Sequence, residues 1–409
     1  MALTTTAWRP SVDGPATLRA ARRWAEPRMR VAYFTESLYP HVDGVSRTLA
    51  RLFDTLLLRG IDFRVFSPFL PPKEVGWRDR VRVMRYVRFP PYPDYRVSLP
   101  YGQRIGEALE EFGADLVHVV SPTPLAYRAQ GIARRLGIPV VGSFHTHFAS
   151  YFRYYGLGPL EPIGWRLLRA FYSRCERVYA PSASIGRELA SQGIESVELW
   201  SRGIDLAGFS PEHRDPAIRG LIGAADTVPV LLMVSRLVRE KDLADLVEID
   251  RILRGRGVRF ALALVGDGPM RARLERKLSH GTFAGHRSGP DLARWYASAD
   301  VFVFPSTTET LGNVVLEALA SGLPAVVSDR GGPQDMIRHG ENGFIARAND
   351  PFDFATHLQR LLENPDLRTR LAHNARASAD SRDWHEINGT LLDSYRKVVT
   401  RRAHVQPSR

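Results

Sequence analysis

The chain has 409 residues, of which 44% are hydrophobic and 24% are charged, and these are ordinary values for a folded globular protein. This length favours two domains over one, and no apolar run approaches the roughly 18 residues that a membrane-spanning helix needs. The single cysteine, Cys175, excludes an internal disulfide and fits a reducing cytosol.

The net charge of +12 suits phosphate-bearing ligands, an anionic membrane face or nucleic acid, and the charge alone does not choose among them. The sequence has neither zinc-ligand spacing nor an interleaved aromatic-basic motif, which makes nucleic acid the weakest of the three. Residues 1–28 lack periodicity and the apolar core of a signal peptide, so they are predicted to form a disordered basic tail.

Strands alternate with helices through the first half of the folded chain. A strand at 30–34 leads into a turn at Gly44 and an amphipathic helix. Further strands are predicted at 62–67, 81–87, 115–120, 139–144 and 177–181, helices at 101–112, 125–136, 166–175 and 184–192, and a loop at 90–100. This alternation predicts a parallel, Rossmann-like sheet in a first domain of residues 29–200.

Two histidines, His145 and His147, follow the strand predicted at 139–144. A histidine at the carboxyl end of a parallel strand points into the ligand crevice, where imidazole can donate to a hydroxyl or buffer a charge. The aromatic and basic residues at 148–155 fit either an interior helix edge or a surface that dips into a bilayer with anionic headgroups.

After a linker at 201–215, a second domain is predicted over residues 216–384. Its first strand is followed by Arg236 and, five residues later, by Lys241. Two fixed cations at the carboxyl edge of a sheet fit a diphosphate, the arginine through a forked contact and the lysine as a point charge. A later strand ends in GDGP, which includes Gly266, but the last glycine of the dinucleotide fingerprint is missing, so a nicotinamide enzyme is disfavoured.

Residues 300–345 carry the strongest chemical signal. A buried strand at 301–304 ends in a polar loop with Glu309, and the helix that follows carries Glu317 eight positions further on. The start of this helix offers free backbone N–H groups that favour a phosphate, at Leu311, Gly312 and Asn313. Two carboxylates that can accept bonds from hydroxyls, with a phosphate site between them, predict a site for a nucleotide sugar.

The E-x7-E pattern of Glu309 and Glu317, followed by ASGLP, the pair Gly331-Gly332 and ENGF, resembles the retaining GT-B glycosyltransferases. The closest likeness is to GDP-mannose-dependent α-mannosyltransferases and to sulfoquinovosyl- or glycosyl-diacylglycerol synthases. The likeness implies an α/β fold of the GT-B type, with two Rossmann-like domains around a cleft. It covers about residues 29–400, is strongest in the second half, and implies a terminal helix at about 385–401 that packs back on the first domain.

The resemblance also implies roles for the donor-side residues. Glu309 would contact the transferred sugar and Glu317 the ribose hydroxyls. Arg236, Lys241 and the helix start at 311–313 would hold the donor diphosphate, so that no metal or other cofactor is expected.

Further roles follow from the same likeness. Gly44 would let the backbone approach the donor phosphates, and His145 would orient the sugar, with His147 as the alternative. The remaining predicted substrate-binding residues are Gly266 and, near the nucleobase, His286 and Arg287.

The sequence therefore predicts a retaining glycosyltransferase that moves a hexose from a nucleotide sugar, with GDP-mannose as the leading donor, to a lipid-type or glycan acceptor. We expect a cytoplasmic protein, with peripheral association at an anionic membrane face and no nucleic-acid partner. One alternative is a UDP-sugar-dependent glycolipid synthase, and another is a basic membrane-surface or nucleic-acid binding protein on a degenerate GT-B scaffold. A glycoside hydrolase also uses two carboxylates, but it needs no paired cations for a phosphate.

Overall fold

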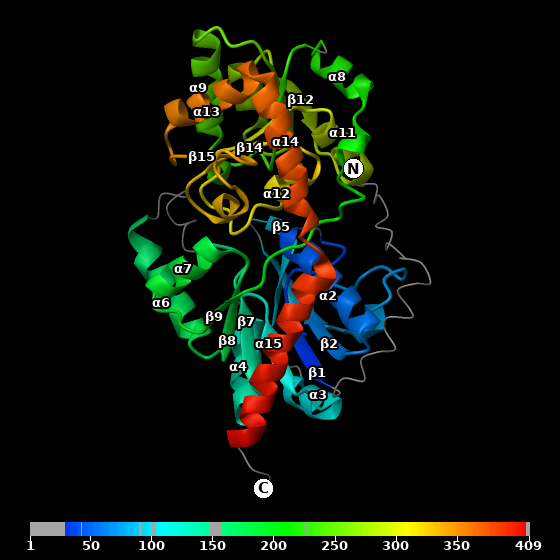
Figure 1. Cartoon of the computed structure of the whole chain (residues 1–409). Helices are drawn as coiled ribbons and strands as arrows, with labels where there is room; N and C mark the ends of the chain where they lie inside the picture. Colours follow the sequence, from blue (N-terminus) through cyan, green and yellow to red (C-terminus); the bar gives the residue numbers. More distant parts are fainter. Residues whose placement is uncertain are drawn as a thin grey trace.

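The computed structural model describes residues 29–41, 43–89, 92–99, 104–147, 158–225 and 227–405. The predicted tail at 1–28 and the aromatic-basic segment at 148–155 lie outside the described residues. Figure 1 shows two lobes, each built around one main sheet. The predicted α/β fold with two Rossmann-like halves is confirmed.

The amino-terminal lobe holds a seven-stranded parallel sheet in the order β3-β2-β1-β6-β7-β8-β9. Its strands are β1 (Arg30–Phe34), β2 (Asp62–Ser67), β3 (Val81–Val83), β6 (Leu116–Val119), β7 (Val140–Ser143), β8 (Arg177–Ala180) and β9 (Val197–Leu199). Its helices are α2 (Gly44–Leu58), α3 (Ile105–Phe112), α4 (Pro124–Arg135), α6 (Glu161–Tyr172) and α7 (Ala183–Ser191). The central strands β6 and β7 are buried throughout and mostly apolar, and they also carry the buried polar residues His118 and Ser143.

The prediction of a loop at 90–100 is wrong. Residues Tyr92–Ser98 form β5, which pairs antiparallel with β4 (Tyr86–Phe89) in a separate two-stranded sheet. The prolines of this segment argue against a central strand, but proline is tolerated at the edge of a sheet.

The carboxyl-terminal lobe holds a six-stranded parallel sheet in the order β12-β11-β10-β13-β14-β15. Its strands are β10 (Val230–Val234), β11 (Ala261–Val265), β12 (Thr282–Gly285), β13 (Val301–Phe304), β14 (Ala325–Ser328) and β15 (Gly343–Ala346). Its helices are α8 (Pro216–Ile222), α9 (Leu243–Gly255), α10 (Arg271–Lys277), α11 (Gly289–Ala297), α12 (Asn313–Ala320), α13 (Pro351–Glu363) and α14 (Pro365–Asp380). The strand order reverses between β10 and β13, and ligands of such sheets bind beyond the carboxyl ends at this switch point.

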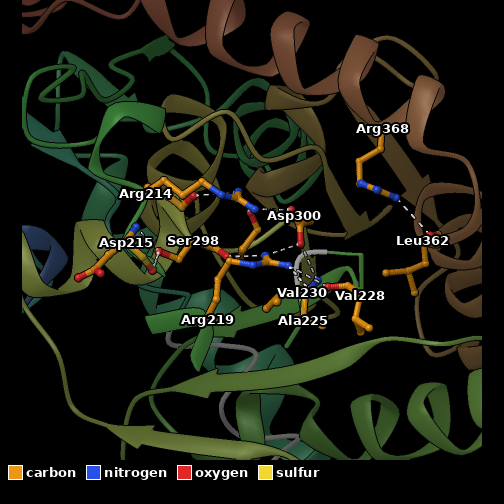
Figure 2. Close-up of polar contacts among 12 residues, drawn as sticks. Arg214, Asp215, Arg219, Ala225, Val228, Val230, Ser298, Asp300, Leu362 and Arg368 are labelled. Atoms are coloured by element: carbon orange, nitrogen blue, oxygen red, sulfur yellow. Dashed lines mark hydrogen bonds and ion pairs between the residues drawn. The ribbon is translucent and has the colours of Figure 1, made fainter. Parts of the chain in front are cut away.

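A cluster of polar contacts ties together the opposite, amino-terminal ends of β10 and β13 (Figure 2). Arg219 in α8 donates to Asp300 Oδ2 at 2.9 Å and to the carbonyl oxygens of Ser298 and Val228 at 3.1 and 2.9 Å. Asp300, directly before β13, also accepts from the backbone N–H of Val230, the first residue of β10, at 2.8 Å. This cluster lies at the edge of the sheet away from the switch point.

The last helix, α15 (Trp384–Val405), runs from the carboxyl-terminal lobe along the amino-terminal lobe (Figure 1). Asn388 donates to Thr55 Oγ1 in α2 at 2.9 Å and accepts from Trp200 at 3.2 Å. The apolar residues of α15 join the core around β1 and α2 and are Leu391, Leu392, Tyr395 and Val398. Among the described residues, no helix is both long and apolar enough to cross a membrane.

Candidate active site

The loop after β13 is fastened to the short 3-10 turn η5 (Arg239–Lys241), which follows β10. The hydroxyls of Ser306 and Thr308 donate to the carbonyl oxygen of Glu240 at 3.3 and 2.8 Å. Asp242 Oδ2 accepts from both the backbone N–H and the hydroxyl of Thr307 at 2.8 Å. These bonds hold the two loops together at the switch point of the sheet.

Lys241 and Glu309 form an ion pair between these two loops. The side chain of Lys241 is 10% exposed and that of Glu309 is 26% exposed. Within the described part of the chain Glu309 is the one recorded partner of the Lys241 ammonium, which has three donors. The pair therefore keeps hydrogen-bonding capacity for a ligand.

The glycine pair at 331–332 supports the loop that carries Glu309. Gly331 has a φ of +78°, and a Cβ at this position would lie 2.6 Å from the carbonyl oxygen of Glu309. Gly332 donates its backbone N–H to the same oxygen at 2.8 Å. Only glycine permits this conformation and this approach without strain, which gives the motif glycines a physical reason.

The start of α12 lies directly after this loop. Gly312 precedes the helix with a φ of +89°, Leu311 is buried, and no side chain caps the first turn. The first N–H groups of a helix have no partner inside it, so this start is suited to an anion. Gly44, at the start of α2 in the other lobe, faces it, since a Cβ on Gly44 would lie 3.4 Å from Asn313 Nδ2. The structure thus brings Gly44 and residues 311–313 together.

Glu317 is buried inside α12, with its side chain 7% exposed. Its carboxylate accepts from the Tyr296 hydroxyl at 3.0 Å and lies 3.7 Å from the Arg47 guanidinium of α2. Burial raises the pKa of Glu317, while the Arg47 charge and the bond from Tyr296 oppose the increase. Arg47 is absent from the predicted site, although it follows Gly44 by one helical turn, and this spacing is the signal that could have found it.

Arg236 and Gly266 lie beside the loop after β10. The Arg236 side chain is 65% exposed and lies 3.7 Å from Glu240. Gly266 has a φ of +136°, and a Cβ there would overlap the carbonyl oxygen of Ser235. Gly266 therefore supports the backbone that carries Arg236.

His286 and Arg287 are exposed residues after β12. Arg287 donates to the carbonyl oxygen of Ala284 at 3.0 Å and to Asp291 at 3.1 Å. Within the described ranges, no hydrogen bond or ion pair joins either residue to the Lys241–Glu309 pair. Their contact with a nucleobase stays a prediction.

His145 follows β7 and contacts both the linker and the other lobe. Its Nε2 lies 2.8 Å from Ser143 Oγ and its Nδ1 lies 2.6 Å from a guanidinium nitrogen of Arg202. Its backbone carbonyl accepts from Thr310 Oγ1 at 2.9 Å. Burial, with the Arg202 charge as the second cause, holds the pKa of His145 well below its ordinary value. Near pH 7 the ring is therefore neutral, and it can orient a sugar only as a neutral group.

His147, the alternative histidine, is buried and lies 2.8 Å from Glu188 Oε1 in α7. It lines a cavity of about 380 Å³ between the lobes, together with Thr307 and Thr308 of the loop after β13. His147 thus lines the cavity, whereas His145 contacts the other lobe through its backbone carbonyl, and the choice between them stays a prediction. Among the described residues, no group of three or more His, Cys, Asp or Glu side chains is placed to hold a metal ion.

Polar contacts join the lobes beside Glu309. Ser182 Oγ donates to the carbonyl oxygen of Thr310 at 2.8 Å, and Ser184 Oγ donates to that of Gly331 at 2.9 Å. The sequence gives no sign of these contacts, because they depend on how the lobes meet. They set the separation of the two sides of the cleft.

Two family models match the chain, one in each lobe. Residues 42–207 match the model described as Glycosyltransferase Family 4, and residues 215–378 match the model described as Glycosyl transferases group 1.

Individual relatives extend over nearly the whole chain. A GDP-mannose-dependent alpha-mannosyltransferase of Mycolicibacterium smegmatis is 36% identical over 92% of this chain and 99% of the relative. The sulfoquinovosyl transferase of Arabidopsis thaliana is 32% identical over 88% of this chain and 72% of the relative. Among solved structures, sucrose-phosphate synthase from Thermosynechococcus elongatus shares the fold, with a TM-score of 0.73 and 20% identity over 91% of this chain and 100% of that chain.

Proposed function

The chain belongs to the GT-B glycosyltransferases, and on this premise we propose that it transfers mannose from GDP-mannose to a lipid-type or glycan acceptor, with retention of anomeric configuration. The Lys241–Glu309 pair beside the uncapped start of α12 carries the proposal. A cation, a carboxylate and helix N–H groups at a switch point are suited to a sugar joined to a diphosphate. The choice of mannose and GDP is supported by the 36% identical relative.

Each side of the donor has a proposed partner. Glu309 accepts bonds from hydroxyls of the transferred sugar, and Glu317 accepts bonds from the ribose. Lys241, Arg236 and the N–H groups at 311–313 hold the diphosphate and stabilise the charge that develops on it. The acceptor hydroxyl attacks the anomeric carbon on the face from which the diphosphate leaves, and its proton passes to a diphosphate oxygen. One C–O bond breaks and another forms on the same face, so the configuration is retained.

A lipid-type acceptor is supported by the outer face of α6. Ile163 and Leu167 lie one turn apart on this helix and are 54% and 59% exposed, and Leu160 just before it is 40% exposed. Arg166 is exposed beside them. An apolar stripe with arginine suits an anionic bilayer surface. Because Glu161 at the start of α6 lines the interlobe cavity, a headgroup could enter the cleft while its acyl chains stay in the membrane.

The test is a transfer assay with radiolabelled GDP-mannose, UDP-glucose and UDP-sulfoquinovose against a lipid extract, each with and without EDTA. We expect transfer from GDP-mannose in EDTA, with an α-linked product by NMR. A β-linked product would contradict retention, and loss of transfer in EDTA that returns with a metal would contradict side-chain stabilisation of the diphosphate.

A second candidate is a UDP-sugar-dependent glycolipid synthase, and the 32% identical sulfoquinovosyl transferase is the observation in its favour. Transfer from a UDP-sugar without transfer from GDP-mannose would establish it.

Membrane association is tested separately by flotation with vesicles of phosphatidylglycerol and phosphatidylcholine. We expect Leu167→Glu to reduce flotation and the exposed-residue control Glu110→Gln to leave it unchanged. We propose that the protein works in the cytoplasm at the inner membrane face, and undiminished flotation of Leu167→Glu would contradict the role of α6.

A further inference from the structure

A row of buried polar groups connects His145 with the terminal helix α15. We infer that Ser143, His118 and Tyr395 are positioning residues that hold the His145 ring as the neutral tautomer with its proton on Nε2. The inference rests on the proposed function, because His145 takes part in transfer only there. It assigns α15 a role beyond packing.

The contacts in the row are short and buried. His145 Nε2 lies 2.8 Å from Ser143 Oγ, and Ser143 Oγ lies 2.9 Å from His118 Nε2. His118 Nδ1 in turn lies 2.5 Å from the Tyr395 hydroxyl. Ser143, His118 and Tyr395 are each 0% exposed. Water therefore does not compete for these bonds, and each group depends on its neighbour in the row.

Arg202 of the interdomain linker determines which ring nitrogen of His145 carries the proton. A guanidinium group has donors and no acceptor, so the 2.6 Å contact from Arg202 requires a lone pair on His145 Nδ1. Burial lowers the pKa of Arg202 to about 9, which leaves it charged near pH 7. A neutral imidazole that accepts at Nδ1 carries its proton on Nε2, and this proton points to Ser143.

The protons available to these groups also determine the tautomer of His118. The two imidazoles are the recorded partners of Ser143 Oγ within the described ranges. If His118 also donated to Ser143, the hydroxyl proton would be buried without an acceptor, which is costly. Ser143 therefore donates to His118 Nε2, and His118 donates from Nδ1 to Tyr395. The Tyr33 hydroxyl is buried beside Tyr395 and has no hydrogen-bond partner among the described residues, so it is the group available to take the proton of the Tyr395 hydroxyl.

The surroundings of His118 agree with a neutral ring. The rings of Tyr33, Trp200 and Tyr179 pack around it at 5.3, 5.9 and 6.0 Å between centroids. Burial lowers the pKa of His118 to about 3. A charge is thus excluded, and what remains is a chain of directed hydrogen bonds.

The row ends at the other lobe rather than at His145. The His145 carbonyl accepts from Thr310, the residue directly after Glu309, at 2.9 Å. The placement of His145 therefore also affects the loop that holds the proposed sugar ligand. Through this contact α15 and the linker are coupled to the cleft.

The direct test reads the tautomers by NMR at pH 7, on protein labelled with ¹⁵N in the rings of its 12 histidines. His118→Gln and His145→Gln assign the two signals. We expect the Nε2–H tautomer for His145 and the Nδ1–H tautomer for His118. The opposite tautomer at either residue, or a charged ring, would overturn the inference. The measurement needs no activity, so it decides the inference even if the proposed function fails.

The functional test compares Tyr395→Phe with Tyr179→Phe, each of which removes one buried hydroxyl. Tyr179 bonds Ser394 of the same helix at 2.8 Å and lies outside the row, so it is a matched control. We expect Tyr395→Phe to lower kcat about tenfold with KM within about twofold, as a misplaced group does, and Tyr179→Phe to stay within about twofold. Equal effects of the two variants, or an unchanged kcat for Tyr395→Phe, would show that the hydroxyl only packs.

Discussion

Two buried ion pairs connect the same two strands, β10 and β13, at opposite ends. Arg219 and Asp300 join the starts of the strands, and Lys241 and Glu309 join the loops beyond their ends. The side chains of Arg219 and Lys241 are 5% and 10% exposed, so both cations are removed from water at a cost. The two pairs differ in what surrounds them.

The protein supplies Arg219 with several further acceptors, namely the carbonyl oxygens of Ser298, Ala225 and Val228. Lys241 has Glu309 alone among the described residues. Lys241, at the carboxyl ends of parallel strands, keeps donors available to a ligand. Arg219, at the amino ends, directs both terminal nitrogens to backbone carbonyls and Asp300, and among the described residues only its Nε has no partner. We therefore assign Arg219 to the fold. Burial alone therefore does not distinguish a functional charge from a structural one.

The largest effect is expected at the structural pair. Asp300→Ala leaves Arg219 buried without its carboxylate, which should cost about 3–5 kcal/mol of unfolding free energy. Urea denaturation measures this loss, while kcat/KM per folded molecule should stay unchanged at low temperature. Glu107→Ala breaks an exposed pair with Arg104 and should cost less than about 1 kcal/mol. A fall in kcat/KM of the folded Asp300→Ala variant would contradict a purely structural role for the Arg219–Asp300 pair.

Lys241→Met should lose activity and keep its stability, which is the opposite of what we expect for Asp300→Ala. It removes the charge that we propose faces the diphosphate while keeping most of the length of the side chain, and transfer should fall about 10²–10³-fold with folding retained. The control is Arg239→Met, which removes an exposed cation from the same short turn and should keep activity within about twofold. Initial rates of transfer with saturating donor measure the two losses. Equal losses in Lys241→Met and Arg239→Met would show that the effect comes from the total positive charge and not from the position of Lys241.

The sequence was sufficient for the fold and for the proximity of Lys241 and Glu309. Apolar periodicity locates nearly all strands and helices, and the hairpin of β4 and β5 is missed because its prolines resemble a loop. Lys241 and Glu309 are found because each follows a buried strand, and parallel strands bring their carboxyl ends to one edge. The sequence features that predict these two residues lie within a few positions of each residue.

The other side of the cleft depends on contacts between distant segments. His118 and Tyr395 lie 277 positions apart, and Arg202 reaches His145 from the linker. Neither pairing leaves a spacing that a single sequence reveals, because each depends on how α15 and the linker pack on the first sheet. Arg47 reaches Glu317 only because the lobes meet.

Glu317→Gln tests a third buried charge, whose partners among the described residues are the Tyr296 hydroxyl at 3.0 Å and the Arg47 guanidinium at 3.7 Å. Replacing the carboxylate by an amide weakens the acceptance of two ribose hydroxyls, and we expect about tenfold weaker GDP binding from the loss of a charge-assisted bond. The thermal shift with GDP measures this. Glu363→Gln, at an exposed position on α13, serves as the control. Unchanged GDP binding by Glu317→Gln would contradict the ribose role.

Glu36, in the loop after β1, is a buried carboxyl that no cation pairs with among the described residues. It is 2% exposed, its Oε1 lacks a hydrogen-bond partner among the described residues, and burial raises its pKa from 4.5 to about 8. The folded state therefore keeps a proton that the unfolded chain releases, and this group makes stability fall as the pH rises from 4.5 to 8.

Glu36→Gln mimics the protonated acid and removes this penalty. We expect a gain in unfolding free energy of about 4 kcal/mol at pH 8 that shrinks toward zero below pH 4.5, measured by urea denaturation across this pH range. Glu110→Gln, at an exposed position in α3, should give no such slope. A gain independent of pH would mean that Gln packs better, and a loss at pH 8 would mean that Glu36 is held ionised by a partner. In either case the comparison of buried charges by the number of their protein partners would not extend to the first lobe.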